Sequence, residues 1–475
     1  MTSQATGNPH FAQCVPRAQG AAFDGWAAAT VWSLVGLRAK QGSALIDWGE
    51  DTGKPVLVPK ACTGRYAKPR LGLIDDLPWV LMSSHEQPFV EHSGGRLVFG
   101  FDLITATGWL LGGYEEYLAN QRDRFGRWDE ANSLVLASGL ATRPAVNIWV
   151  NRIRDFLEAR GVELAALWPD GKRFAVALTH DVDNPRYFGW RQLRRLIRSL
   201  CRRDRGAARS ALMKLGAMTI IASRDRFTGP KGFARLLAAE GSFGFRSTIL
   251  LSGLPSGSPY ADANDPAYDI EDSFLQPSIR LAREGGYEMA LHPSLATAPH
   301  VGRYREQKER VEHAARCSLL SARHHYWNVT RQDTGAALDA MGEAGLEFDS
   351  SLSFYSAPGF RRSIAWPFIP FHPLANRSVS VVELPPTLMD RWAGKQGAHE
   401  VLDDHLGMVQ RHRGLAVLNW HVNRFSNRHY AAEGRVYLEA LAALAAREDV
   451  WVARLCDVGE WWRQRTECAG GRQCT

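Results

Sequence analysis

An apolar run that stops abruptly on two acids constrains the fold of this chain more than any other stretch. The segment Arg173-Phe-Ala-Val-Ala-Leu-Thr-His-Asp-Val-Asp183 is partly β-branched and is typical of a buried strand. Because alternate side chains of a strand point to the same face, we expect Asp181 and Asp183 to project together from its C-terminal end. Two like charges held so close need a cation or a proton between them, which favours a metal ligand beside a general base. The alternative is a helix N-cap with a solvated neighbour, since Asn184-Pro185 follows.

Strand-like and helix-like segments alternate from residue 171 onward. This alternation predicts a parallel βα-repeating architecture, either a barrel or a large open sheet. We expect strands over 174–179, 245–251, 287–291, 321–326, 347–354, 379–384, 415–421 and 450–455. We expect helices over 232–240, 334–345, 399–412, 434–447 and 457–465.

The first 170 residues show a different, mixed pattern. A short β-like run at 96–102 and helical stretches around 103–118 and 147–160 predict a smaller α+β accessory domain over residues 1–170. The turn-forming sequence Trp168-Pro-Asp-Gly171 marks its boundary with a larger α/β domain over 171–467, which a short tail follows at 468–475. The pattern assigns no role to the accessory domain.

Composition narrows the classes to which the protein can belong. Of 475 residues, 45% are hydrophobic and 23% are charged, as expected of a globular protein with two domains. Seven scattered cysteines, never spaced as C-x-x-C, argue against a zinc ribbon or a disulfide framework. The most apolar stretch, 25–37, is too short to span a membrane and is expected to be a core helix. We therefore expect a cytoplasmic protein, free or peripheral at the inner face of the cell membrane, with an exported form as the alternative.

Histidines follow several of the predicted strands. His292 closes the run at 287–291, Arg323-His-His-Tyr326 ends another strand, and Trp420-His421 ends the strand at 415–421. Each histidine alone is more often structural or exposed. Because the C-terminal ends of parallel strands converge on one face, their shared position with the two acids predicts a single site.

A series of short motifs follows in order along the chain: Thr179-His-Asp-Val-Asp183, His292-Pro-Ser294, Arg323-His-His-Tyr326, Phe348-Asp-Ser-Ser-Leu352 with Gly359-Phe-Arg361, Glu383-Leu-Pro385 with Met389-Asp390, and Trp420-His421. This order resembles that of the polysaccharide deacetylases, the carbohydrate esterases of family 4 with a NodB homology domain. The resemblance covers roughly residues 172–465, and residues 70–165 are similar to an upstream region seen in one bacterial branch. It implies a distorted (β/α) barrel and metal-dependent removal of acetyl groups from amino sugars or sugar hydroxyls.

The resemblance implies a role for each matching residue. Asp181 would be the general base that takes a proton from the attacking water, and His421 would protonate the leaving group. Asp183 and His292 would bind the metal. The supporting residues would be Arg323, which orients the base, and Asp390, which supports the site.

One position departs from the family pattern. The family usually has a second metal histidine about one helical turn after the first, but residue 296 is alanine here. Since catalytic zinc normally takes three protein ligands, two would make a weak site. His325 is the candidate replacement ligand, and His300 is a weaker one on an expected loop. The expected cofactor is a divalent metal, zinc first, with cobalt, manganese or nickel as alternatives.

A basic insertion is expected to form helical structure near 190–225. Between residues 191 and 214 it carries nine basic residues and one acid, Asp204, beside an apolar stripe at helical spacing. Together with the formal net charge of +7, this predicts peripheral contact with an anionic membrane. The alternative packs the stripe on the barrel and leaves the arginines solvated. Nucleic-acid binding is not expected, because the helix lacks interleaved aromatic residues.

Three functions remain open on the sequence. The first is a metal-dependent hydrolase that deacetylates a glycan or lipid-linked sugar during synthesis of cell-surface polysaccharide or glycolipid. The second is a degenerate, non-catalytic member that binds a glycan or scaffolds an assembly, which the alanine at position 296 favours. The third is an amidase for a non-carbohydrate amide, since the same chemistry serves any amide that fits.

Overall fold

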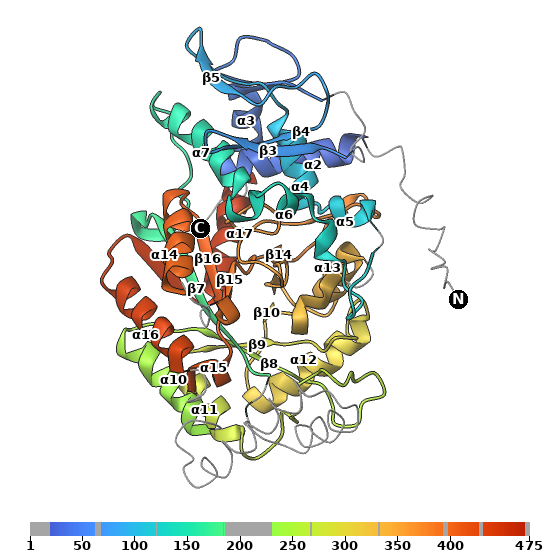
Figure 1. Cartoon of the computed structure of the whole chain (residues 1–475), viewed down its shortest axis with the longest axis vertical. Coiled ribbons are helices and arrows are strands. Elements are labelled where there is room, and N and C mark those ends of the chain that lie inside the picture. Colours follow the sequence, from blue (N-terminus) through green and yellow to red (C-terminus); the bar gives the residue numbers. More distant parts are fainter. Residues whose placement is uncertain are drawn as a thin grey trace, which may run out of the picture.

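The centre of the molecule is a nine-stranded sheet in which every strand pair is parallel (Figure 1). The computed structural model describes residues 20–61, 68–119, 121–183, 185, 230–266, 268–330, 333–392, 398–426 and 431–470. The strands of the sheet are β7 (Phe174–Asp181), β8 (Thr248–Leu251), β9 (Glu288–Leu291), β10 (Ser321–Ala322), β11 (Phe348–Asp349), β14 (Val382–Glu383), β15 (Leu388–Met389), β16 (Leu415–Asn419) and β17 (Val450–Ala453). Their order is β14-β11-β10-β9-β8-β7-β16-β15, with β17 paired to β7.

The sheet is curled, and the length of one connection explains why. The two ends of the strand path, β14 and β15, are joined only by residues 384–387. That link reaches at most about 18 Å, whereas eight strands laid flat would separate the ends by about 34 Å. The sheet must therefore bend round on itself, which confirms the predicted α/β class and distorted (β/α) barrel.

Strand β7 lies inside this sheet and has neighbours on both edges. Its eight residues are all buried, as the apolar run predicts. Along one edge it pairs with β16 over residues 175–179. Along the other edge it pairs first with β17, over 174–177, and then with β8, over 179–181. The strand is thus paired on both sides up to Thr179, and β8 continues the pairing to Asp181.

Helices surround the curled sheet, as Figure 1 shows. Most connect consecutive strands, which is the usual consequence of parallel pairing. They are α10 (Pro230–Ser242), α11 (Gln276–Glu284), α12 (Val301–Ala315), α13 (Thr334–Glu343), α14 (Ala398–Arg411), α15 (Val422–Ser426), α16 (Ala431–Ala445) and α17 (Leu455–Gly470). Helix α13 begins where Asp333 accepts hydrogen bonds from the backbone N–H groups of Gly335 and Ala336.

The N-terminal part of the chain forms smaller sheets and its own helices. Strands β1 (Ile46–Trp48), β2 (Val56–Val58), β6 (Arg96–Phe99) and β5 (Val90–Ser93) form one sheet, and β3 (Arg70–Ile74) and β4 (Leu77–Leu81) form a hairpin. The helices are α2 (Gly20–Val35), α3 (Ala39–Leu45), α4 (Leu103–Leu111), α5 (Glu115–Leu118), α6 (Leu134–Ala137) and α7 (Ala145–Glu158). Helix α2 includes most of the stretch expected to be a core helix, and Phe23, Ala27 and Val31 on it are fully buried.

The N-terminal part packs against the barrel through one continuous hydrophobic core. At Gly359 the two parts come so close that an added Cβ would lie 2.1 Å from the carbonyl oxygen of Ala141. Buried charge also crosses the boundary: Glu116 accepts hydrogen bonds from Arg361 and Thr334 and pairs with Arg362 at 2.9 Å. We call these four residues the Glu116 junction. The division of the chain at residue 170 stays a prediction.

The structure differs from the sequence-based expectations at two places, and one expected element lies outside the described residues. The strand predicted over 321–326 was wrong beyond Ala322, because the chain turns there into a 3₁₀ segment, His325–Thr330, with φ values of 57° at Tyr326 and 54° at Trp327. A short antiparallel ribbon, β12 (Phe371–His372) with β13 (Arg377–Ser378), was not predicted. The basic insertion at 191–214 lies outside the described residues. Within the described ranges, no helix combines the length and apolar character needed to cross a membrane.

Candidate active site

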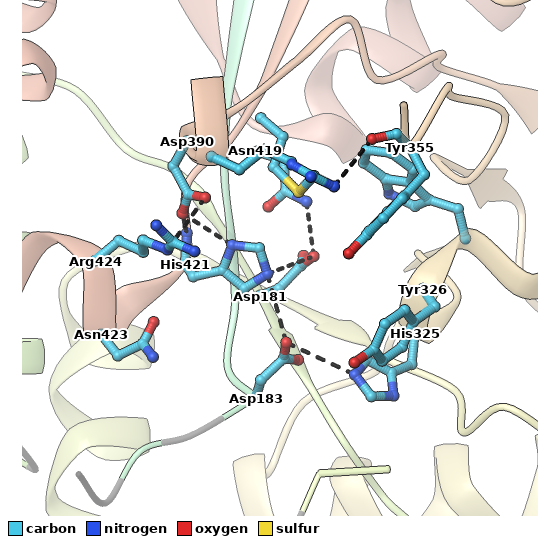
Figure 2. A pocket seen from close by; sticks show the side chains of 13 residues that line it. Asp181, Asp183, His325, Tyr326, Tyr355, Asp390, Asn419, His421, Asn423 and Arg424 are labelled. Atoms are coloured by element: carbon cyan, nitrogen blue, oxygen red, sulfur yellow. Dashed lines mark hydrogen bonds and ion pairs between the residues drawn. The ribbon is translucent and has the colours of Figure 1, made fainter. Parts of the chain in front are cut away.

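A polar pocket of about 510 Å³ opens at the C-terminal ends of the barrel strands. Its walls come from the ends of β7, β15 and β16 and from the turn after β10, so segments far apart in sequence meet there. Figure 2 shows His421 beside Asp390, with Asp181, Asp183 and His325 facing the same space. We call this the strand-end pocket. It is lined by Asp181, Asp183, His325, Tyr326, Trp327, Tyr355, Met389, Asp390, Arg391, Asn419, His421, Asn423 and Arg424.

Three residues beside this pocket offer ligand atoms for one metal ion. The carboxylate of Asp183 lies 3.1 Å from His292 Nε2 and 3.7 Å from His325 Nε2. One ligand atom from each residue lies within 4.8 Å of the other two. An Asp-His-His set with an open side toward a pocket is the donor set of a catalytic rather than a structural metal site.

The second nitrogen of each histidine ring is also occupied. His292 Nδ1 lies 2.6 Å from the carbonyl oxygen of Arg323, and His325 Nδ1 lies 3.4 Å from Asp265 Oδ1. Asp265 is itself held, because its Oδ1 accepts a hydrogen bond from the backbone N–H of Leu295 at 2.7 Å. Such partners direct the Nε2 lone pair of a metal-binding histidine toward the ion. The site therefore has supporting contacts as well as three donors.

The charges in this group are arranged to favour a cation. Burial alone would raise the pKa of Asp183, but the facing His325 and hydrogen bonds from His292 and His421 hold it well below its usual range. Burial alone would lower the pKa of His325, but Asp183 and Asp265 raise it to about 9. When no ion is bound, the His325 ring, which faces these carboxylates, is therefore protonated at neutral pH. A divalent cation can take the place of that positive charge.

Asp181 occupies a different environment from Asp183. It is buried, its Oδ1 lies 3.1 Å from a guanidinium nitrogen of Arg323, and its Oδ2 accepts a hydrogen bond from Asn419 at 2.8 Å. Burial raises the pKa of this carboxyl, but Arg323 and then His292 and His421 outweigh that effect and lower it. Asp181 is therefore ionised at neutral pH and able to accept a proton.

Arg323 is completely buried and held by four hydrogen bonds. Its Nε donates to the carbonyl oxygen of Ser350, and its terminal nitrogens donate to the hydroxyls of Thr179 and Ser350 as well as to Asp181. A guanidinium fixed in this way gives Asp181 a single orientation.

His421 faces both acids from the opposite wall of the strand-end pocket. Its Nε2 lies 3.4 Å from Asp183 and 4.0 Å from Asp181. Asp390 accepts hydrogen bonds from its backbone N–H at 2.6 Å and from its Nδ1 at 2.9 Å. Burial lowers the pKa of His421, but Asp390 and Asp183 raise it well above its usual value. His421 is therefore protonated at neutral pH and oriented to donate.

A second buried histidine fixes the backbone that carries His421. His180, next to Asp181 on β7, has Nδ1 2.7 Å from the carbonyl oxygen of Trp420. Its Nε2 lies 2.6 Å from Glu240, which also accepts a hydrogen bond from the hydroxyl of Tyr437. All three side chains are fully buried, so this group acts on the site only through the position of residue 420.

The structure brings together all seven predicted site residues. His300 does not join them: it is exposed and immediately precedes helix α12. Asn419 and Asp265 were missed by the sequence analysis. Asn419 precedes His421 by two residues and shares its side of the strand end, so the two-residue periodicity could have revealed it. Asp265 lies on a loop far from His325 in sequence, and no pattern signals it.

Comparisons with known proteins give limited information. Residues 65–161 match a family of unknown function (DUF7033), a range that overlaps most of the region noted above at 70–165. No curated protein matches the sequence. A Mycobacterium smegmatis protein assigned as a polysaccharide deacetylase is 21% identical, with a TM-score of 0.43 and a match covering 66% of this chain and 96% of that chain.

Two further solved structures are similarly distant. A Pseudomonas aeruginosa PAO1 protein also assigned as a polysaccharide deacetylase is 14% identical, with a TM-score of 0.40 and coverage of 64% of this chain and 95% of its own. PuuE allantoinase is 14% identical, with a TM-score of 0.41 and coverage of 64% and 94%. At such values the function has to be argued from the site itself.

Proposed function

We propose that this protein is a metal-dependent hydrolase that removes acetyl groups from an amino sugar or a sugar hydroxyl. The observation that carries the proposal is that three metal-donor residues, an ionised carboxylate and a protonated histidine face each other at the strand-end pocket. Metal-assisted hydrolysis of an amide or ester combines these three functions.

The donor set fits a divalent cation. Asp183, His292 and His325 supply one carboxylate and two imidazoles, and zinc accepts this mixture of ligands. When bound there, the ion would polarise the acetyl carbonyl and lower the pKa of a water molecule.

Asp181 would act as the general base. It is ionised, its orientation is fixed by Arg323 and Asn419, and it lines the strand-end pocket. In an acetyl-transfer step to water, it would take the proton that the attacking water loses. Arg323 and Asn419 touch the base rather than the substrate, so we assign them positioning roles.

His421 would act as the general acid. Its Nε2 faces the same space as Asp181, and Asp390 on its Nδ1 stabilises the protonated ring. A departing amine is a poor leaving group unless it is protonated, so His421 suits removal of an N-acetyl group in particular. We expect His421→Ala to lower turnover much more than substrate binding.

The wider role is part of the same proposal. The substrate would be an acetylated glycan or lipid-linked sugar, and the setting would be synthesis of cell-surface polysaccharide or glycolipid in the cytoplasm or at the inner face of the membrane. Support for this setting comes from the order of the motifs and from the scattered cysteines. Among the described residues, Cys317 and Cys456 have free thiols.

The first experiment is to measure metal per chain together with acetate release. The bound metal of protein purified without chelator is measured by elemental analysis. Acetate release is assayed on N-acetylated and O-acetylated sugars. We expect nearly one zinc or similar ion per chain in the wild type and its loss in His292→Ala and His325→Ala. The matched control is His300→Ala, which removes an exposed histidine outside the site and should keep the metal.

The opposite result is equally informative. A wild type that takes up no metal even after soaking with zinc or cobalt would contradict the proposal and favour a non-catalytic glycan-binding protein. Stoichiometric metal and hydrolysis of small non-carbohydrate amides, with no release from sugars, would instead favour the amidase.

A further inference from the structure

Two arginines line the strand-end pocket, and their charges face different groups. Arg424, which lies beside Asp390 in Figure 2, has its Nε 3.6 Å from that carboxylate and a terminal nitrogen 3.2 Å from Glu433. Arg391, by contrast, pairs with no carboxylate in the part of the chain that the structure describes. Its positive charge is therefore available to a ligand, whereas that of Arg424 is already balanced.

The Arg391 guanidinium is held by Tyr355. One of its terminal nitrogens donates a hydrogen bond to the carbonyl oxygen of Tyr355 at 3.1 Å, and its central carbon lies 4.3 Å from the centre of the Tyr355 ring. Tyr355 is fixed in turn, because its backbone N–H donates to Glu130 at 2.6 Å. Arg127 also lies against this ring, but its charge is paired with Asp123 at 2.6 Å. Arg391 thus presents a guanidinium whose position is set before a ligand arrives.

Most of the hydrogen-bonding capacity of Arg391 is unused. A guanidinium has five N–H donors, and among the described residues only the Tyr355 carbonyl accepts from this one. The side chain is half-buried and lines the strand-end pocket. A positive fork with open donors at a pocket wall suits a carboxylate or a phosphate, whose paired oxygens accept two parallel hydrogen bonds. A sugar hydroxyl would leave the charge unbalanced.

The acids of the pocket do not exclude such an anion. Asp181 already contacts the guanidinium of Arg323. Asp183 lies 3.4 Å from the protonated ring of His421. Because the charges of both acids are matched before a ligand enters, the positive charge of Arg391 favours an anionic substrate over a neutral one.

Arg391 lies on the side of the pocket from which the leaving group departs. Strands β15 and β16 pair with Met389 opposite Asn419, and Arg391 and His421 each follow two residues later. Asp390, which precedes Arg391, accepts the hydrogen bonds from the backbone and the ring of His421. In the proposed reaction His421 protonates the departing amine or hydroxyl, which belongs to the sugar and not to the acetyl group. Arg391 is therefore placed to contact a substituent of the sugar.

We propose that Arg391 binds a negatively charged group, a carboxylate or a phosphate, on the sugar that loses its acetyl group. The substrate class is then an acetylated sugar that carries its own negative charge, such as a uronate or a sugar phosphate. This inference rests on the proposed function for the acetyl group and the sugar, while the contacts of Arg391 support the anion. Arg391 selects the substrate and takes no part in bond cleavage.

Calorimetric binding compares sugars that differ in charge. The probes are N-acetylglucosamine, its 1-phosphate, its 6-phosphate and N-acetylglucosaminuronic acid. The protein is the full chain carrying Asp181→Asn, which slows hydrolysis of the probes, at equal metal content and below the melting temperature of every variant. We expect at least one anionic probe to bind at least about tenfold more tightly than the neutral sugar. The probe that does so identifies the source of the charge.

Further variants assign this preference to a residue. Arg391→Met keeps the apolar stem and removes the charge, so the preference should fall below about threefold. Arg391→Lys keeps a point charge without the planar fork and should retain part of the preference. The control is Arg305→Met, which removes an equal charge from an exposed position on α12 outside the pocket and should leave the preference unchanged.

The other outcomes have distinct meanings. Equal or absent binding of the neutral and anionic probes overturns the proposal, as does a preference that survives in Arg391→Met. Affinities in Arg391→Lys that match those of Arg391→Met also overturn it, since charge would then not be what is recognised. Loss of the preference in Arg305→Met overturns it by showing an effect of net charge. A preference that depends on Arg391, in a protein whose wild type releases no acetate from any sugar, would keep the anion position and refute only the hydrolase.

Discussion

The strand-end pocket and the Glu116 junction both bury carboxylates against guanidinium groups, yet they differ in what those carboxylates face. At the junction, Glu116 is shared between Arg361 and Arg362, and the pair of positive charges lowers its pKa despite its burial. In the pocket, Asp181 contacts a single guanidinium, that of Arg323, among the residues that the structure describes. Like Asp183 and His421, it borders open space. Buried charge alone therefore does not mark an active site in this protein. What distinguishes the candidate active site is buried charge that an incoming ligand can reach.

The largest effect on catalysis is expected when Asp181 in the strand-end pocket is neutralised. We expect Asp181→Asn to lower kcat by about 10³- to 10⁴-fold, or about 4 to 5.5 kcal/mol in activation free energy, because it removes the general base. The melting temperature should fall as well, because Asn leaves the fully buried guanidinium of Arg323 without its carboxylate partner. Acetate release and a thermal melt on the same sample test both parts. More than a tenth of wild-type turnover would refute the assignment.

At the junction, by contrast, we expect an effect on stability without a direct effect on catalysis. Glu116→Ala leaves two buried guanidinium groups without their shared carboxylate, so we expect the free energy of unfolding to fall by about 3 to 5 kcal/mol. Denaturant titration measures the change. The control is Asp76→Asn, which removes the charge of an exposed pair with Arg143, tolerates the φ of 63° at this position and should cost at most about 1 kcal/mol. Similar losses in both variants would mean that the junction does not couple the two parts of the chain.

A smaller effect is expected at the residue that supports a candidate metal ligand. Asp265→Asn weakens the partner of His325 Nδ1 without touching the donor atoms, so zinc affinity should fall by about 10- to 100-fold. Competition with a chromogenic chelator gives the affinity directly. Glu271→Gln, a change at an exposed acid nearby in sequence, serves as the control. Unchanged affinity in Asp265→Asn would show that His325 is oriented by other contacts.

The smallest expected effect concerns pH and lies outside both clusters. His372 sits between Asp333 and Asp339, at 3.0 and 2.8 Å. Burial lowers the pKa of His372, but Asp333 and Asp339 together raise it above its usual value. Burial raises the pKa of Asp333, but His372 and the hydrogen bond from Tyr117 together lower it below its usual value. The folded state thus binds the histidine proton more tightly than the unfolded state does.

That difference fixes the sign of the pH dependence. The contribution of this contact to stability is complete between about pH 4 and pH 6.5, and it is lost as the pH rises through the folded pKa of His372 or falls through that of Asp333. His372→Gln should therefore reduce stability by about 1 kcal/mol at pH 6 and by less at pH 9. Denaturant titrations at the two pH values provide the test. A larger loss at pH 9 would contradict the assignment.

The sequence predicts the parts of the fold that rest on apolar periodicity. Strand β7 and helices α13, α14 and α16 were found within a few residues, because their buried faces leave a regular pattern. Helix α12 was missed because only Tyr304, Gln307, Val311 and Ala315 are buried along its length, which is too weak an apolar signal. The strand predicted over 347–354 shrank to Phe348–Asp349, since its later residues turn away to bond Arg323 and Glu383.

The residues of the candidate site also differ in whether apolar periodicity predicts their positions. Asp181, Asp183 and His421 follow strands, so strand geometry alone predicts that they meet. His325 reaches the pocket only through a turn with two successive positive φ values at Tyr326 and Trp327, which no residue type there signals. Its choice as a ligand came from the family resemblance and the alanine at 296, and periodicity alone would have left it in a strand.

The pairing of β7 on both edges has a consequence for local opening of the structure. Its backbone amides bond to β16 on one edge and to β17 or β8 on the other, beneath a fully buried surface. Such amides exchange with solvent deuterium only when the whole domain opens. The spacing of Asp181 from its neighbours is therefore set by the slowest-exchanging part of the molecule. Heating or denaturant should abolish turnover only together with global unfolding.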